Sequence, residues 1–238
     1  TESAASRRMD RVLWGREDQD LSINSLRDFL VHRTAWLDKQ VAMWTAGEIP
    51  DLYFQDIKDN DWFYESVEYA VEHGLFTGSS ATQFEPYSPI NRSMAVAVLY
   101  RMAGSPETNH RSDYKDIDHN AWYKAAVDWA TENQIADGIG KSLFAPNSLV
   151  SREQLITLLY RLVLNMGMQV ENKHALSAFS DSEEISPWAY EAMAWAVDSG
   201  IIKGANGRLN PQGDTTRAQA AAIVSRVYQL YFDMGERS

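Results

Sequence analysis

The sequence predicts an all-α protein built from three copies of one helix–loop–helix unit. The first observation is a pattern that occurs three times, at residues 74–94, 134–154 and 200–219. In each place a glycine-containing loop and a proline lead to a helix-capping residue and an arginine. The second observation is apolar spacing of three and four residues on both sides of the loop, which is typical of amphipathic helices. A repeat of about sixty residues indicates units that bury one shared core.

Aligned residues recur at fixed intervals in the three copies, with each tryptophan sixteen residues before a glycine. The aligned sets are Asp56, Asp116 and Asp181; Trp62, Trp122 and Trp188; Gly78, Gly138 and Gly204; Pro86, Pro146 and Pro211; and Arg92, Arg152 and Arg217. We place the repeats at 52–104, 112–165 and 177–231, joined by polar connectors.

Composition excludes several classes of protein. The 238 residues include no cysteine, which excludes disulfides and thiol chemistry. A formal net charge of −11 disfavours nucleic acid and anionic membranes as partners, and no apolar run is long enough to span a bilayer. The chain begins with threonine and no signal-peptide pattern follows, so we expect a processed or excised piece.

Residues 1–46 lie outside the repeats. Apolar residues between Leu26 and Val41 recur at helical spacing and predict one amphipathic helix that ends near Gly47. The segment from Arg33 to Asp38 weakly resembles the C-terminal tail of spore-coat-type secreted kinase domains. Two interpretations stay open: a helix that packs on the repeats, or the remnant of an upstream domain.

The first helix of each repeat is predicted to begin after Asp61, Asn120 or Ser186, all of which are residue types that cap helices. We expect Trp188 on its buried face. Gly200 supplies the left-handed residue that ends the helix in the third copy, as Gly74 does in the first. In the second copy Gln134 is aligned, and the neighbouring Asn133 is a plausible substitute.

The second helix of each repeat is predicted to begin at Asn91, Ser151 or Thr216. Gln154 and Gln219 stand three residues after their caps, which predicts a capping box in the second and third copies. We expect at most short extended pieces around Phe84, Phe144 and Leu209, which lie between the two helices.

The arginine after each cap calls for an explanation, since the start of a helix carries partial positive charge and favours acidic residues. Arg92, Arg152 and Arg217 make sense if an external anion is bound there by the guanidinium and free backbone N–H groups. The alternative is pairing with an internal acid, for which Asp56, Asp116 and Asp181 are the candidates. The sequence physics leaves the two interpretations about equal.

Other aligned residues sharpen the ligand hypothesis. Lys203 could add a second cation to the pocket of Arg217, and Gly204 would allow a ligand to approach the backbone. The three aligned tryptophans are more often core residues, but an indole face can also stack on a sugar.

Signals for catalysis are weak. No carboxylate pair stands out, no nucleophile motif or phosphate-binding loop is present, and the five histidines have no metal-ligand spacing. We therefore expect no catalytic residues, no metal and no cofactor.

The three repeats resemble the S-layer homology module, whose hallmark motif is Ile-Thr-Arg-Ala-Glu. The corresponding segments are 90–94, 150–154 and 215–219. The resemblance implies a pseudo-threefold spindle that anchors an exported protein to the bacterial cell wall. It also implies an anionic ligand, a secondary wall polymer bearing ketal-linked pyruvate on N-acetylmannosamine.

Carried over by position, the resemblance makes Arg92, Arg152 and Arg217 the groups that meet the pyruvate carboxylate. The remaining candidate ligand-binding residues are Lys203, Gly78, Gly138, Gly204, Trp62, Trp122, Trp188, Gln154 and Gln219. We expect a monomer with unequal grooves, and the groove of Arg217 and Lys203 to bind best. Two alternatives remain: the C-terminal part of a surface enzyme, or an open helical-repeat module that binds proteins.

Overall fold

The computed structural model describes residues 54–170 and 176–233. The chain divides into two compact units, Thr1–Asp51 and Leu52–Ser238, and all described residues belong to the second. The helix predicted from Leu26 to Val41 and its two interpretations lie outside the described residues.

The described part is helical and contains isolated β-bridges but no strand. The α-helices are α3 (Tyr64–Glu72), α4 (Arg92–Met102), α5 (Lys124–Glu132), α6 (Arg152–Asn165), α7 (Tyr190–Asp198) and α8 (Arg217–Tyr231). Short 3-10 helices cover Leu176–Ala178, Ser182–Glu184 and Pro187–Ala189. The all-α prediction is confirmed, and each repeat contributes two α-helices.

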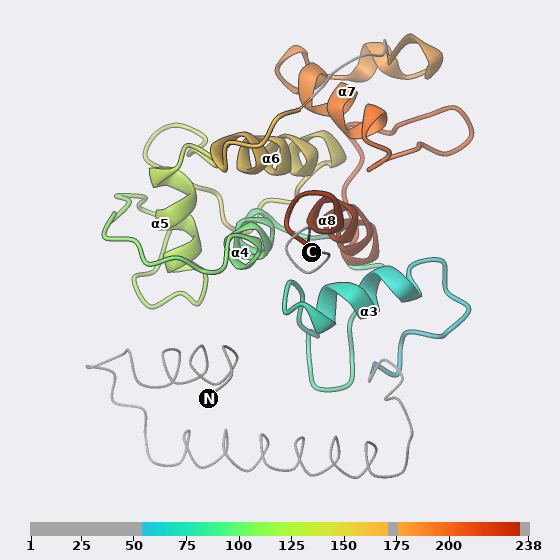
Figure 1. The fold of residues 1–238 in the computed structure, drawn as a ribbon. Coiled ribbons are helices and arrows are strands. Elements are labelled where there is room, and N and C mark those ends of the chain that lie inside the picture. The colour runs from blue at the N-terminus through green and yellow to red at the C-terminus, as the bar shows by residue number, and fades with distance from the viewer. Residues whose placement is uncertain (1–53, 171–175, 234–238) are drawn as a thin grey trace. The chain divides into compact units, whose positions relative to one another are not determined.

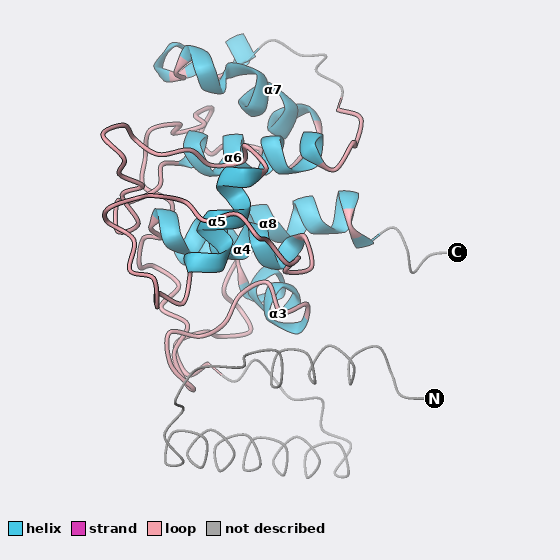
Figure 2. Cartoon of the chain, turned by 90° about the vertical axis from the view of Figure 1, so that its left-hand side faces the viewer, coloured by secondary structure: helices cyan, strands magenta, loops and turns pink. Residues whose placement is uncertain are grey.

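The second helices of the repeats form the middle of this unit, and the first helices lie outside them (Figure 1; Figure 2). The first helix of a repeat packs on the second helix of a different repeat: α5 on α4, α7 on α6, and α3 on α8. Because α3 belongs to the first repeat and α8 to the third, the contacts between repeats close into a ring. An open solenoid is therefore excluded for the described residues, while the spindle shape stays a prediction.

The predicted starts of the second helices are confirmed. The side chains of Asn91, Ser151 and Thr216 accept a hydrogen bond from the backbone N–H three residues on. Complete capping boxes occur with Gln154 and Gln219, as expected from the two glutamines.

The predicted starts of the first helices are two to three residues too early in the first and second copies, whereas in the third copy a 3-10 helix begins at Pro187 after Ser186, as predicted, and leads into α7. The helices α3 and α5 begin at Tyr64 and Lys124, and neither has a side-chain cap. Asp61 instead closes the preceding turn, where its carboxylate accepts from the N–H of Lys58 at 2.8 Å. The helix ends fit better: Gly74 and Gly200 are left-handed, and Gln134 itself, not Asn133, takes that conformation with φ 55°.

The three repeats meet in a cycle of backbone hydrogen bonds just before the second helices. The N–H of Ile90 donates to Thr215, that of Thr215 to Val150, and that of Val150 to Ile90, at 2.9 to 3.1 Å. All three side chains are buried. The motif that precedes each arginine therefore holds the repeats together, in addition to starting a helix.

Thr215 is the polar member of this trio, and its replacement by valine should stabilise the fold. Its Oγ1 is buried and has no hydrogen-bond partner in the described part of the chain. Valine has nearly the same shape, and an unpaired buried hydroxyl costs about 1 kcal/mol. We expect Thr215→Val to raise the free energy of unfolding by about that amount in urea titrations. Val150→Thr, the reverse change at an aligned position, should destabilise the protein.

Candidate functional site

Two of the three repeated arginines reach across to another repeat and bind backbone carbonyls there. Arg92 Nε donates to Phe144 O at 2.9 Å, and its Nη2 donates to Asp137 O at 2.8 Å. Its guanidinium carbon lies 4.7 Å from the centre of the Phe144 ring, within range of a cation–π interaction. The first repeat therefore delivers its arginine to the loop of the second.

Arg217 repeats this geometry between the third repeat and the first. Its Nε donates to Phe84 O at 2.5 Å and its Nη2 to Thr77 O at 2.7 Å. The guanidinium carbon lies 4.5 Å from the centre of the Phe84 ring. Arg217 is only 8% exposed, so this guanidinium is part of the packed interface between repeats.

The aligned aspartates bind the N–H groups of the same peptide groups whose carbonyls accept from the arginines. Asp116 accepts from the N–H groups of Phe144 and Ala145, at 2.8 and 2.7 Å, and Asp56 binds the two equivalent groups of the first repeat. One peptide group thus contacts a carboxylate through its N–H and a guanidinium through its C=O. The interpretation of these aspartates as direct ion-pair partners of the arginines is wrong for the described residues.

The guanidinium groups of this site have no carboxylate partner in the described part of the chain. The ion pairs found there involve other cations, such as Lys124 and Arg208. Burial lowers the pKa of Arg92, an effect that the more distant charges of Asp116 and Asp137 oppose. Arg92 uses two of its five N–H donors on carbonyls and remains partly exposed, so it could bind an anion with the others.

The helix N-termini are not available for an anion, contrary to the prediction of free N–H groups. The first two N–H groups of α4 donate to the carbonyls of Ser148 and Pro146, at 2.9 and 3.0 Å. Those of α6 donate to Gly213 and Pro211, and those of α8 to Ser88 and Pro86. Carbonyl groups of a neighbouring repeat thus accept the hydrogen bonds that were expected to bind an anionic ligand. The guanidinium is the group that can still bind an anion.

Arg152 differs from the other two arginines. Its Nε is buried and has no hydrogen-bond partner in the described residues, although burial lowers its pKa as in the others. The loop that α6 adjoins contains Leu209 where the other repeats contain a phenylalanine, and it is one residue shorter. A leucine offers no aromatic face to a cation, and among the described residues the cation–π contacts of this site involve Arg92 and Arg217 but not Arg152.

The predicted pairing of Lys203 with Arg217 is not supported by the contacts. Lys203 is exposed and aligns with Thr77 and Asp137, the residues whose carbonyls bind Arg217 and Arg92. The first N–H groups of α6 bind the carbonyls of Pro211 and Gly213 in the third repeat. By analogy with the other two interfaces, the arginine that corresponds to the loop of Lys203 is Arg152.

Packing explains why glycine stands at the three aligned positions. A Cβ on Gly138 would lie 2.6 Å from the Tyr114 ring and 2.7 Å from Leu143 O, and Gly78 is enclosed in the same way. At Gly204, where φ is 67°, the neighbours are Phe179 and Arg208 O. Packing within the loop thus accounts for the missing side chain at Gly204, and its contact with a ligand stays a prediction.

The aligned tryptophans are not core residues. Trp62, Trp122 and Trp188 are 63%, 62% and 55% exposed. The default expectation of burial is therefore wrong, including for Trp188. Each lies two residues before the first residue of an α-helix, and Trp188 belongs to the 3-10 helix Pro187–Ala189, so the α-helical turn that buries Ala192 and Trp195 does not include it.

Comparison with known families decides what the repeats are. The S-layer homology domain matches residues 53–95, 113–156 and 178–221, which together make up more than half of the chain. The chain belongs to the S-layer homology family. Its three modules each contain one of the arginines described above, and the earlier resemblance is confirmed.

Curated relatives include enzymes and surface proteins. The chain is 31% identical over 175 residues to an amylopullulanase of Thermoanaerobacterium thermosulfurigenes, covering 73% of the chain and 9% of that protein. It is 32% identical to the surface-layer 125 kDa protein of Lysinibacillus sphaericus, with 69% and 14% covered. The cellulosome-anchoring protein of Acetivibrio thermocellus is 25% identical, with 65% and 36% covered.

The S-layer homology repeats therefore form only a small part of these longer relatives. Among solved structures, the undecaheme cytochrome from the S-layer of Carboxydothermus ferrireducens covers 68% of this chain and 24% of its own, at 16% identity and a TM-score of 0.29, too low to inform the fold. S-layer homology repeats anchor proteins at the bacterial cell surface, and this chain comes from an exported surface protein. No helix of the described residues is long and apolar enough to cross a membrane.

Proposed function

We propose that the modules at 52–104, 112–165 and 177–231 bind an anionic secondary cell-wall polysaccharide that bears pyruvate ketals on N-acetylmannosamine. The chain acts as a non-catalytic, monomeric anchor for the rest of a surface protein. In this proposal the carboxylate meets the guanidinium groups of Arg92, Arg152 and Arg217. The exposed indoles of the aligned tryptophans offer apolar area for sugar rings.

The observation that supports the proposal is a set of buried or half-buried guanidinium groups that form no ion pair with a carboxylate among the described residues. A cation in such a place gains from an anion brought from outside, since Coulomb interactions are stronger at the low effective dielectric of a protein surface groove. The net charge of −11 is no obstacle, because it is screened beyond about 8–10 Å at physiological salt.

Arg152 is the residue we expect to contribute most to binding. Its buried Nε has no partner in the described residues, and Lys203 is aligned with the two residues whose carbonyls bind the other arginines. We expect Arg152→Ala to weaken binding of a pyruvylated saccharide by about thirtyfold to a hundredfold, as for a partly buried charge pair. Lys203→Ala should weaken it by a smaller factor, because Lys203 is exposed.

Isothermal titration of the full chain with a pyruvylated saccharide measures these effects. Arg208→Ala, which removes an exposed cation from the same loop, is the control and should change the affinity little. Binding to purified cell walls before and after chemical removal of pyruvate tests the ligand itself. Equal binding to both walls would contradict the proposal.

The enzyme names among the relatives suggest what the anchor accompanies. The amylopullulanase is far longer than the matched segment. We propose that this chain likewise belongs to a larger surface protein whose activity resides outside the repeats.

A further inference from the structure

The second repeat contains a polar pocket of about 230 Å³ that the arginine site does not use. It is lined by residues 110–114, by Thr131 of α5 and by Ser142 of the following loop. The volume is below the 300–1,000 Å³ typical of drug-sized ligand sites, so the pocket suits a single small ring.

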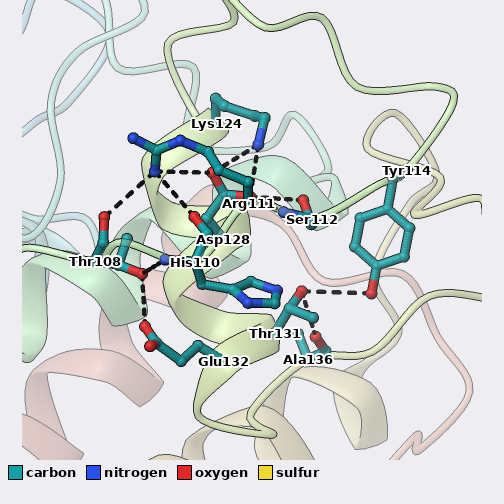
Figure 3. Close-up of polar contacts among 10 residues, drawn as sticks. All are labelled: Thr108, His110, Arg111, Ser112, Tyr114, Lys124, Asp128, Thr131, Glu132 and Ala136. Carbon is teal, nitrogen blue, oxygen red and sulfur yellow. Dashed lines mark hydrogen bonds and ion pairs between the residues drawn. The ribbon is translucent and has the colours of Figure 1, made fainter.

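The wall of the pocket is held firmly to α5. Asp128 is 1% exposed and accepts from both the N–H and the hydroxyl of Ser112, at 2.8 and 2.6 Å (Figure 3). Lys124 Nζ lies 2.6 Å from each oxygen of the same carboxylate. This network fixes the connector before the second repeat against its first helix.

Two hydroxyl groups of the pocket are poorly used by the protein. Thr131 Oγ1 lies 3.4 Å from the Tyr114 hydroxyl and 3.4 Å from Ala136 O, which are long for O–H···O hydrogen bonds (Figure 3). The Thr131 hydroxyl has one proton, so when it donates to Ala136 O the Tyr114 hydroxyl can donate to Thr131 Oγ1, at the same long distance. These groups remain able to bind a ligand that carries hydroxyls of its own.

The hydroxyl pair is specific to the second repeat. The residues aligned with Tyr114 and Thr131 are Phe54 and Val71 in the first repeat and Phe179 and Val197 in the third. The chain thus contains its own matched controls, in which the same fold is built without these hydroxyls.

The charges around the pocket favour a neutral ligand. Arg111 Nη1 lies 4.0 Å from Asp128, whose other ion-pair partner is Lys124, and with the carboxylate of Asp113 the formal charges of these four side chains sum to zero. Asp113 adds an exposed negative charge at the rim. An anion would gain little here, whereas a hydroxyl-rich molecule would find donors and acceptors.

The pocket adjoins the Arg92 site through the Tyr114 ring. This ring packs against Gly138, and its centre lies 5.4 Å from that of Phe144, the ring beneath the Arg92 guanidinium. We infer that the pocket binds a neutral sugar residue next to the anionic residue at Arg92. This inference rests on the proposed function and extends it to a longer segment of the polymer.

The test compares two ligands by two-dimensional NMR on the full chain. One is the methyl glycoside of pyruvylated N-acetylmannosamine, and the other carries one further neutral sugar. The disaccharide should bind the second repeat about tenfold more tightly, as for one or two added hydrogen bonds, and should shift the signals of the Thr131 methyl group. Tyr114→Phe with Thr131→Val should abolish this gain and leave the monosaccharide affinity unchanged.

Tyr87→Phe, which removes an exposed hydroxyl from the first repeat, is the control and should keep the gain. If the monosaccharide binds but the added sugar brings no gain, or the double variant retains it, this inference is wrong and the proposed function stands. If neither ligand binds, the proposed function fails and the inference fails with it.

Discussion

Arg217→Ala is expected to lower the free energy of unfolding by about 3–5 kcal/mol, because it removes two charged hydrogen bonds and leaves two carbonyls unpaired. These are the bonds to Thr77 O and Phe84 O, which join the third repeat to the first. Removing the guanidinium also leaves a cavity beside the Phe84 ring, because Arg217 is only 8% exposed. Urea unfolding followed by circular dichroism measures the change.

Arg152→Ala is the matched control for this prediction. Its Nε makes no hydrogen bond in the described residues, so we expect a loss of stability of about 1 kcal/mol or less. We therefore expect the two variants to differ: Arg217→Ala should mainly lower stability, and Arg152→Ala should mainly lower ligand affinity. Equal losses of stability in the two variants would contradict this division.

Asp181→Asn is expected to cost about 2–4 kcal/mol of unfolding free energy at pH 7. The Asp181 carboxylate is buried and accepts from the N–H groups of Leu209 and Asn210, at 2.9 and 2.7 Å. An amide has one acceptor oxygen, so one N–H loses its partner. The second of these N–H groups belongs to Asn210, which is left-handed with φ 52° and needs the bond to offset its strain.

The pH dependence has a definite sign. Burial raises the pKa of Asp181, but the backbone hydrogen bonds and the charge of Arg208 outweigh it and hold the pKa below its ordinary value of 3.8. A group with a lowered folded-state pKa stabilises the fold above its unfolded pKa, and the contribution disappears as the pH falls through the folded value. The difference in unfolding free energy between wild type and Asp181→Asn should thus be constant near neutral pH and become smaller below about pH 4.

Urea unfolding titrations of both proteins between pH 2 and pH 7 measure this difference in unfolding free energy. Glu183→Gln removes an exposed carboxylate two residues away and should unfold like the wild type throughout. A difference that persisted unchanged to pH 2 would show that the amide acts through its shape alone.

Local features of the fold follow from the sequence because they depend on neighbours along the chain. The caps at Asn91, Ser151 and Thr216 and the two capping boxes were predictable from residues within one helical turn. Three aligned copies made the repeat itself certain. The start of the first helix in the first copy was misplaced because Asp61 closes a turn with Lys58, a competing local use of the same side chain.

The sequence by itself determined that three S-layer homology repeats each contain an arginine after a helix cap, because residue types and spacing are sufficient for that. Only the tertiary structure decided where those arginines go. Arg217 binds a carbonyl 133 residues away, and spacing within a repeat contains no information on which repeat a side chain will reach. The closed ring of contacts between repeats made that choice, and it also supplies the carbonyls that bind the first N–H groups of each second helix.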